Sequence, residues 1–237
     1  MAKRGGTKHL KRIASAKAIP VTDKKEHTWM TKAAPGPHPA KHSIPLGVLI
    51  RDILKIATTL REVRRILASR LLEVDGSVRT DEKFPVGLMD VISFPKGGKH
   101  FRIIVDSKGR LVPHEISKDA AAHKILRVVK KHTIPGGKIN VTFHDGRNQL
   151  ADNHIHVGDS VIVSLPKAVL KSHLKRDKGA RCLIMEGKHA GTIVMLKEII
   201  ERKGGKPSEA LVQDKSEEFV TVAKYLFVVD EAFGAKG

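Results

Sequence analysis

Residues 59–80, TLREVRRILASRLLEVDGSVRT, contain the signals for a complete helix and hairpin. Thr59 and Glu62 form a Thr-x-x-Glu capping box, which is typical of a helix start. The apolar residues that follow at helical spacing, and therefore predict its buried face, are Leu60, Val63, Ile66 and Leu67. Asp75-Gly76 then stands between apolar residues, as in a two-residue β-hairpin turn. This stretch predicts a helix followed by two short antiparallel strands.

The polar face of the predicted helix is basic. Arg61, Arg64 and Arg65 share one face, and Arg70 and Arg79 follow nearby in the sequence. A solvated, salt-bridged face is the usual explanation of such a row. Here only one acid intervenes, and like charges on one helix face oppose helix formation unless something neutralises them. The row therefore indicates a surface that faces an anion.

Other elements extend this unit on both sides. Leu46–Ala57 has apolar residues at helical spacing, and Phe84–Phe94 ends in a strand-like segment. Residues 101–165 are rich in strand signals, among which Ser117–His132 indicates a short helix followed by a strand. Pro166–Lys175 is interpreted as a linker.

The last segment predicts a five-stranded barrel. Its first two strands flank a turn in which Gly187 and Gly191 bracket a basic tip, Lys188-His189. A plain β-turn is the alternative interpretation of this pattern. The further strand candidates are Ala210–Gln213, Phe219–Val222 and Tyr225–Val229.

Positive charge is concentrated at the start of the chain. The protein has 44 Lys and Arg against 25 Asp and Glu, a formal net charge of +19, which predicts a polyanionic partner. Residues 1–42 hold 10 of the basic residues and only 2 acids. The apolar residues of this arm are few, mainly Leu10, Ile13, Ile19 and Trp29. We therefore predict an extension that becomes ordered on its partner. A solvated tail with no role and a mitochondrial transit peptide are the alternatives, although Gly5-Gly6 and the charged residues 23–26 disfavour a cleavable amphipathic helix.

Composition limits how an anion can be held. Only 7 Phe, 1 Trp and 1 Tyr are present, so base stacking cannot be the main interaction, and phosphate contacts and shape must dominate. Cys182 is the only cysteine, which excludes an intramolecular disulfide and Cys-rich zinc sites and favours a reducing cytoplasm. No apolar stretch approaches the roughly 20 residues that span a bilayer, and no secretory signal is expected.

The sequence indicates no enzyme, metal or cofactor. The glycine-rich nucleotide motifs, the nucleophile elbow and the zinc-protease motif do not occur. His154 and His156 would share a strand face with Asp152 and could hold a metal, although a polar loop edge is the more common role of such a trio. Cys182 lies in an apolar pattern, which favours a small buried side chain over a nucleophile.

The motifs that distinguish a family are spread along the whole chain. They are Lys8–Arg12 (KHLKR), Pro35–His38 (PGPH), the run from Ile66 through Val74–Asp81 to Met89–Ser93, His144–Gly146, and Gly158-Asp159. Together they resemble the S4e family of small-subunit ribosomal proteins found in archaea and eukaryotes. The chain ends soon after Val229, which is similar to the archaeal members.

The resemblance implies an α+β multidomain protein. Its parts would be a basic N-terminal extension (1–42), an α/β S4-type RNA-binding domain (43–100), a β-rich central domain (101–171) and a KOW motif in an SH3-like β-barrel (172–237). In the KOW stretch, Val194 stands where many family members have glycine, which leaves the backbone path there open.

We therefore expect a structural constituent of the small ribosomal subunit in the cytoplasm, in contact with ribosomal RNA and neighbouring ribosomal proteins. The alternatives are an RNA-modifying enzyme with an accessory RNA-binding fold and a general nucleic-acid binder driven by charge. The residues expected to contact RNA are Lys3, Arg4, Lys8, His9, Lys11, Arg12, Lys17, Arg61, Arg64, Arg65, Arg70, Arg79, Lys188 and His189.

Overall fold

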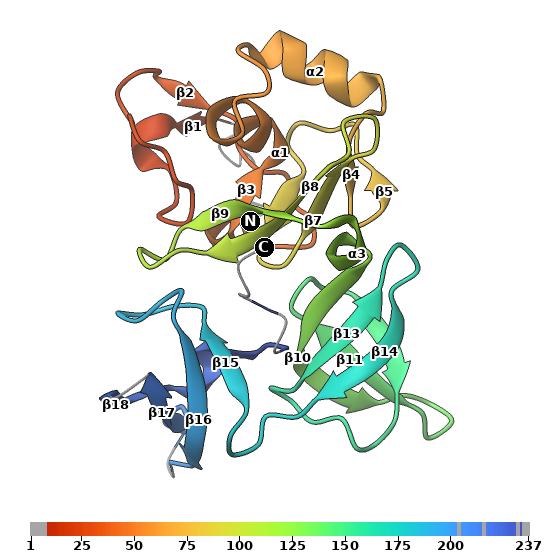
Figure 1. Cartoon of the computed structure of the whole chain (residues 1–237), viewed down its shortest axis with the longest axis vertical. Helices are drawn as coiled ribbons and strands as arrows, with labels where there is room; N and C mark the ends of the chain where they lie inside the picture. Colours follow the sequence, from red (N-terminus) through yellow and green to blue (C-terminus); the bar gives the residue numbers. More distant parts are fainter. Residues whose placement is uncertain (1–8, 203–204, 215–216, 231–232, 234–237) are drawn as a thin grey trace, which may run out of the picture. The chain divides into compact units, whose positions relative to one another are not determined.

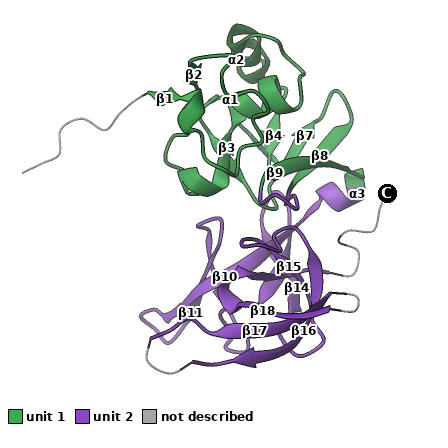
Figure 2. Cartoon of the chain, turned by 90° about the vertical axis from the view of Figure 1, so that its left-hand side faces the viewer, with its two compact units in different colours: residues 1–104, 110–118 green, residues 105–109, 119–237 purple. Residues whose placement is uncertain are grey.

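The computed structural model describes residues 9–202, 205–214, 217–230 and 233 (Figure 1). The chain divides into two compact units (Figure 2). The first comprises residues 1–104 and 110–118, and the second comprises residues 105–109 and 119–237. Strands hold more residues than helices in both units, and the described helices are short. No described helix has the length and apolar character that crossing a bilayer would require.

The helical part of the first unit contains one longer helix. α2 (Leu60–Ala68) begins at the predicted capping box: the Glu62 N–H donates to Thr59 Oγ1 and the Thr59 N–H donates to Glu62 Oε2, both at 3.3 Å. Val63 and Leu67 are fully buried, whereas Leu60 and Ile66 are half-buried. The predicted helix and its buried face are therefore confirmed.

The helix predicted over 46–57 is shorter than expected. α1 (Leu46–Val48) continues into the π-helical turn η3 (Leu49–Ile53) and then ends. Lys55 adopts a φ of +53°, in the left-handed region that an L-residue helix cannot continue through.

A five-stranded sheet with the order β5-β4-β7-β8-β9 packs in the same unit. Its strands are β4 (Glu73–Val74), β5 (Ser77–Val78), β7 (Val91–Phe94), β8 (Lys99–Val105) and β9 (Leu111–Ile116). The predicted Asp75-Gly76 turn joins β4 to β5, and both turn residues have positive φ, as type I′ turns require. A separate pair joins β3 (Ser43–Pro45) to β6 (Pro85–Gly87). The boundary expected between residues 100 and 101 falls within β8, which pairs with β7.

The N-terminal arm packs against the rest of this unit and buries apolar residues of its own. It contains β1 (Leu10–Lys11), η1 (Arg12–Ala14), β2 (Trp29–Met30) and η2 (Ala40–His42). Ala18, Ile19, Val21 and Met30 are buried, so the expectation that the arm has little to bury is wrong. His38, at the end of the arm, contacts Asp90 at 3.0 Å in the buried interior.

The second unit contains most of α3 (Lys118–Ala121) and a sheet of order β12-β11-β10-β13-β14. Its strands are β10 (His123–Thr133), β11 (Ile139–Phe143), β12 (Asn148–Ala151), β13 (Ser160–Ser164) and β14 (Val169–Leu174). The helix-then-strand prediction for 117–132 is confirmed. The linker predicted at 166–175 is wrong, because β14 lies there, hydrogen-bonds to β13 and places Leu170 against the core.

The C-terminal sheet has the order β18-β17-β16-β15-β19. Its strands are β15 (Arg181–Ile184), β16 (Ile193–Ile200), β17 (Glu209–Asp214), β18 (Glu217–Val222) and β19 (Leu226–Val228), with η4 (Ala223–Tyr225) before the last. Its concave face holds a core that includes Cys182, Val194 and Val212. In the part of the chain that the structure describes, β18 and β19 are the two edges, so the sheet forms a half-barrel.

Candidate nucleic-acid interface

The arm ribbon, β1 paired with β2, has one face toward the protein and one toward solvent. Leu10 lies opposite Met30, and Lys11 lies opposite Trp29. Directly opposed residues of an antiparallel pair project from the same face of the sheet. Met30 is 5% exposed and Trp29 is 56% exposed, so the first pair faces inward and the second outward.

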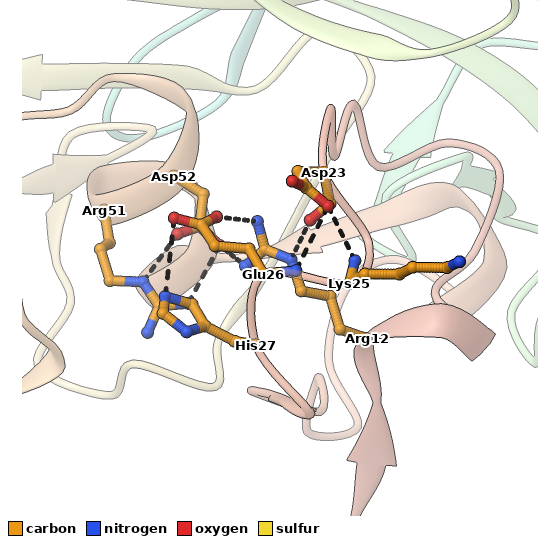
Figure 3. Close-up of polar contacts among 7 residues, drawn as sticks. All are labelled: Arg12, Asp23, Lys25, Glu26, His27, Arg51 and Asp52. Atoms are coloured by element: carbon orange, nitrogen blue, oxygen red, sulfur yellow. Dashed lines mark hydrogen bonds and ion pairs between the residues drawn. The ribbon is translucent and has the colours of Figure 1, made fainter.

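A buried arginine holds this ribbon in place. Arg12 is only 4% exposed, and its guanidinium contacts the Asp23 carbonyl oxygen at 2.8 Å, Asp52 at 3.2 Å and Glu26 at 3.3 Å (Figure 3). Asp52, in turn, accepts two hydrogen bonds from Arg51, and Asp52 is the main cause that raises the pKa of that arginine. We call Arg12, Asp23, Glu26 and Asp52 the Arg12 cluster. It joins the arm to the helical part of the same unit.

The Arg12 cluster changes the role of one residue expected to contact RNA. Arg12 is buried and engaged by carboxylates of the protein, so almost none of it is exposed. His9, Lys11 and Lys17 are exposed. The expected residues Lys3, Arg4 and Lys8 lie outside the described residues.

The arginine row on α2 is exposed, but its members are not equivalent. Arg64 makes a bidentate contact with Glu82, with distances of 2.5 and 2.8 Å, and this hydrogen bonding raises the pKa of Arg64. Arg61 and Arg65 make no ion pair among the described residues, and both are exposed. The salt-bridged interpretation therefore holds for Arg64 alone, and its partner was not identified from the sequence because Glu82 lies 18 residues away.

Two further arginines of this unit differ in exposure. Arg70 follows α2 with a φ of +54° and is exposed. Arg79 is half-buried, with its guanidinium carbon 4.5 Å from the centre of the Phe84 ring. Its Nε is buried without a hydrogen-bond partner in the described part of the chain.

The glycine-bracketed turn between β15 and β16 is formed as predicted. Gly187 and Gly191 have φ values of +100° and +79°. Lys188 is exposed, whereas His189 is half-buried and stacks on Phe219 with ring centres 4.0 Å apart. A Cβ on Gly191 would lie 2.6 Å from the backbone of Asp106, which belongs to the same unit. This glycine is needed for close backbone approach as well as for its conformation.

A basic hairpin that the sequence analysis missed joins β10 to β11. Lys130, His132 and Lys138 are exposed there, and Lys131 donates to Asn153 from its side chain. The signal was present in the Lys-Lys-His run and the Pro-Gly-Gly turn that follows it, at residues 130–137.

The aspartates of the two central motifs are structural. Asp145 is buried beside the fully buried Lys124, at 3.4 Å. Asp159 accepts hydrogen bonds from the backbone N–H groups of His156 and Arg176 and lies 2.7 Å from His173 Nε2. Burial by itself would raise the pKa of Asp159, but these hydrogen bonds together lower it.

The candidate metal ligands do not share a strand face. Residues 152–156 form a turn after β12, so the strand predicted for Asp152, His154 and His156 is wrong. Among the residues that the structure describes, no three metal-binding side chains gather. Cys182 is fully buried in β15, and this burial raises its pKa to about 12, which keeps the thiol protonated.

Comparison with known proteins places the chain in a family. Residues 97–169 match the "Ribosomal family S4e", and residues 4–41 match the "RS4NT (NUC023) domain". The small ribosomal subunit protein eS4 of Methanothermobacter thermautotrophicus is 39% identical over 230 residues, covering 97% of this chain and 95% of that protein. The chain belongs to the ribosomal S4e family.

Other members of the S4e family agree along nearly the whole length. The small ribosomal subunit protein eS4 of Methanosphaera stadtmanae is 40% identical over 231 residues, covering 98% of this chain and 95% of that protein. The crystal structure of the 30S ribosomal protein S4e from Thermoplasma acidophilum has a TM-score of 0.70 and 34% identity, covering 81% of this chain and 96% of that one. The resemblance found in the sequence is therefore confirmed.

Proposed function

We propose that this chain is a structural constituent of the small ribosomal subunit and binds ribosomal RNA. The observation that carries this function is the similarity of nearly the whole chain, at 39% and 40% identity, to proteins named small ribosomal subunit protein eS4. The exposed basic groups of the arm ribbon and α2 support it physically. In this role the protein works in the ribosome, in the cytoplasm, beside other small-subunit proteins, and catalyses no reaction.

RNA binding would combine charge and shape. Lys11 and Lys17 of the arm, Arg61 and Arg65 of α2, and Arg70 would neutralise phosphates, while the folded units fix the register on the RNA. Lys3, Arg4, Lys8, His9, Arg79, Lys188 and His189 are proposed as further contacts. Arg12 and Arg64 would position the surface, because both are engaged by carboxylates of the protein.

We also propose the finer division of the chain: an N-terminal extension to residue 42, an S4-type domain, a β-rich central domain, and a KOW motif in an SH3-like domain from residue 172. The match of residues 4–41 to a domain of its own supports the first boundary. The half-barrel and its glycine-bracketed turn support a separate C-terminal domain, which would begin after β14, because β14 pairs with β13 and runs across residue 172.

Charge reversal on α2 tests the proposed interface. Arg61→Glu with Arg65→Glu should weaken binding to small-subunit ribosomal RNA at least tenfold in a filter-binding assay, because two phosphate contacts become repulsive. Lys206→Glu with Lys224→Glu makes the same charge change at exposed positions of the nearly neutral C-terminal segment and is the control.

Affinities that fall equally in the two double variants would contradict a localised interface on α2. Co-sedimentation of the native protein with the small ribosomal particle after a moderate salt wash tests the function itself. Absence of the protein from that particle would overturn it.

A further inference from the structure

The only tryptophan of the chain is held open to solvent. Trp29 lies on the outward face of the arm ribbon, next in sequence to the buried Met30 and opposite Lys11. Its exposure therefore follows from the register of the ribbon and not from a frayed end. Single exposed apolar residues are common on protein surfaces. An exposed indole directly opposite a lysine is a more specific arrangement.

A second ring stands beside this indole. The His9 and Trp29 ring centres are 5.6 Å apart, and the ring planes are inclined by 56°. At this inclination the imidazole does not lie flat on the indole, so it does not cover an indole face as a stacked ring would. The two rings are therefore inclined to each other, and a ligand between them would contact an aromatic ring on either side.

The Arg12 cluster fixes the backbone beneath the two rings. The Arg12 N–H donates to the Thr28 carbonyl at 3.0 Å, which extends the β1–β2 ladder by one step beyond Lys11 and Trp29. The Arg12 side chain then ties the ribbon to Asp52 (Figure 3). Because the backbone that carries Trp29 is already fixed, less conformational freedom is lost when a ligand stacks on the ring.

The charges of the arm favour a nucleic acid over a protein side chain. Lys11, directly opposite Trp29, is exposed, as are Lys24 and Lys25 of the same described arm. The two acids of the same segment are already engaged: Asp23 accepts from the Lys25 and Glu26 backbone N–H groups, and Glu26 pairs with Arg12. The surface therefore offers aromatic faces together with free positive charge, which is the combination that single-stranded nucleic acid recognises.

We propose that Trp29, with His9, is a stacking site for one unpaired nucleobase of the ribosomal RNA, and that Lys11 meets the phosphate next to that base. The inference rests on the proposed function. It adds a ligand of a different kind from the phosphates bound elsewhere. Bases that are splayed out of loops and bulges are the elements that aromatic side chains stack on in RNA.

Because Trp29 is the only tryptophan, its fluorescence reports on this site alone. The full chain is titrated with small-subunit ribosomal RNA of its source organism. Stacking should quench the indole emission and protect the remaining emission from acrylamide. In filter binding, Trp29→Ala should reduce affinity by about 5- to 150-fold, the loss typical of removing one base–aromatic stack.

Three further variants separate stacking from other contacts. Trp29→Phe keeps an aromatic face and should retain most of the affinity, whereas Trp29→Leu keeps apolar bulk alone and should bind as weakly as Trp29→Ala. Val220→Ala removes an equally exposed apolar side chain of the C-terminal sheet and should bind like the wild type. Circular dichroism confirms that each variant is folded.

The failures of the two proposals are distinguishable. If the wild type binds the RNA with unchanged fluorescence and Trp29→Ala binds equally well, the stacking site is overturned and the proposed function stands. If Trp29→Leu binds like the wild type while Trp29→Ala is weaker, the contact is apolar, and stacking is again overturned. If the wild type neither binds this RNA nor sediments with the small particle, the proposed function fails.

Discussion

Gly191 and Gly136 illustrate two different reasons why a position in this fold requires glycine. Both have positive φ, at +79° and +88°, but a Cβ on Gly191 would meet the Asp106 backbone whereas one on Gly136 would meet nothing within 4 Å. Gly136→Ala should therefore cost only the strain of a left-handed alanine, about 1 kcal/mol. Gly191→Ala should cost about 2–4 kcal/mol, because the backbone must also move.

Urea unfolding of both variants measures the difference. Equal free energies of unfolding for Gly191→Ala and Gly136→Ala would show that the close approach to Asp106 has no energetic weight.

Asp159 should make stability depend on pH in the acid range. Its pKa in the folded protein is lowered, despite burial, by hydrogen bonds from His156, Arg176 and His173. A carboxyl group with a depressed folded pKa stabilises the fold above its unfolded pKa of about 3.9, and this contribution is lost as the pH falls through the folded value. The advantage of wild type over Asp159→Asn should thus be present at pH 6 and shrink below about pH 4.

Urea unfolding at pH 6 and pH 3 measures this advantage, with Asp177→Asn on an exposed loop as the control for loss of one carboxylate. A wild-type advantage over Asp159→Asn that is the same at both pH values would contradict the assignment.

The arm ribbon depends on a contact that no local pattern could indicate. Arg12→Met removes the guanidinium that joins the ribbon to Asp52, 40 residues away, and leaves a carboxylate partly buried with fewer partners. Asp52 keeps its contact with Arg51, and Glu26 is exposed. We therefore expect the free energy of unfolding to fall by about 1–3 kcal/mol, less than for a fully buried pair.

This loss of stability should appear as faster cleavage of the arm by thermolysin, a protease that does not require Lys or Arg at its cleavage site. Lys11→Met also replaces a cation by methionine, at the exposed neighbouring position, and should leave the cleavage rate unchanged. Equal rates for the two variants would remove the Arg12 cluster as the anchor.

Elements with local signals could be predicted from the sequence. The capping box of Thr59 and Glu62 specified where α2 begins, and Asp75-Gly76 specified its hairpin, since both signals act within four residues. Elements defined by long-range pairing could not. β14 was misread as a linker, because what makes it a strand is its ladder with β13.

The candidate site divides in the same way. The exposure of Arg61 and Arg65 follows from helical periodicity, and it was predicted correctly. The engagement of Arg12 and Arg64 depends on carboxylates far along the chain, and the exposure of Trp29 depends on the register of a two-residue ribbon. Neither the distant partners nor the register can be read from nearby residues.

The distribution of charge over the molecule predicts a steep salt dependence of RNA binding. Each phosphate that is neutralised contributes roughly 0.9 to the slope of log affinity against log salt if the RNA behaves like a B-form duplex. Replacing Lys11, Arg61 and Arg65 together by alanine should therefore reduce the magnitude of the slope by about 2.7.

Filter binding between 50 and 300 mM KCl would measure the slope. Replacing Lys206 and Lys224 by alanine should leave it at the wild-type value. A triple variant with the wild-type slope would show that these three side chains do not contact phosphates.

The two units are interleaved along the chain, and this affects the order in which they can be completed during synthesis. Residues 105–109 belong to the second unit, although the strands on either side of them, β8 and β9, lie in the sheet of the first. Asp106 packs against Gly191, which is translated 85 residues later. At elongation rates of about 5–20 residues per second, that interval lasts roughly 4–17 s. The hairpin of β8 and β9 is therefore synthesised seconds before the loop that contacts its turn. All strands of the first unit's sheet are present in the growing chain before the last strands of the second unit have been made.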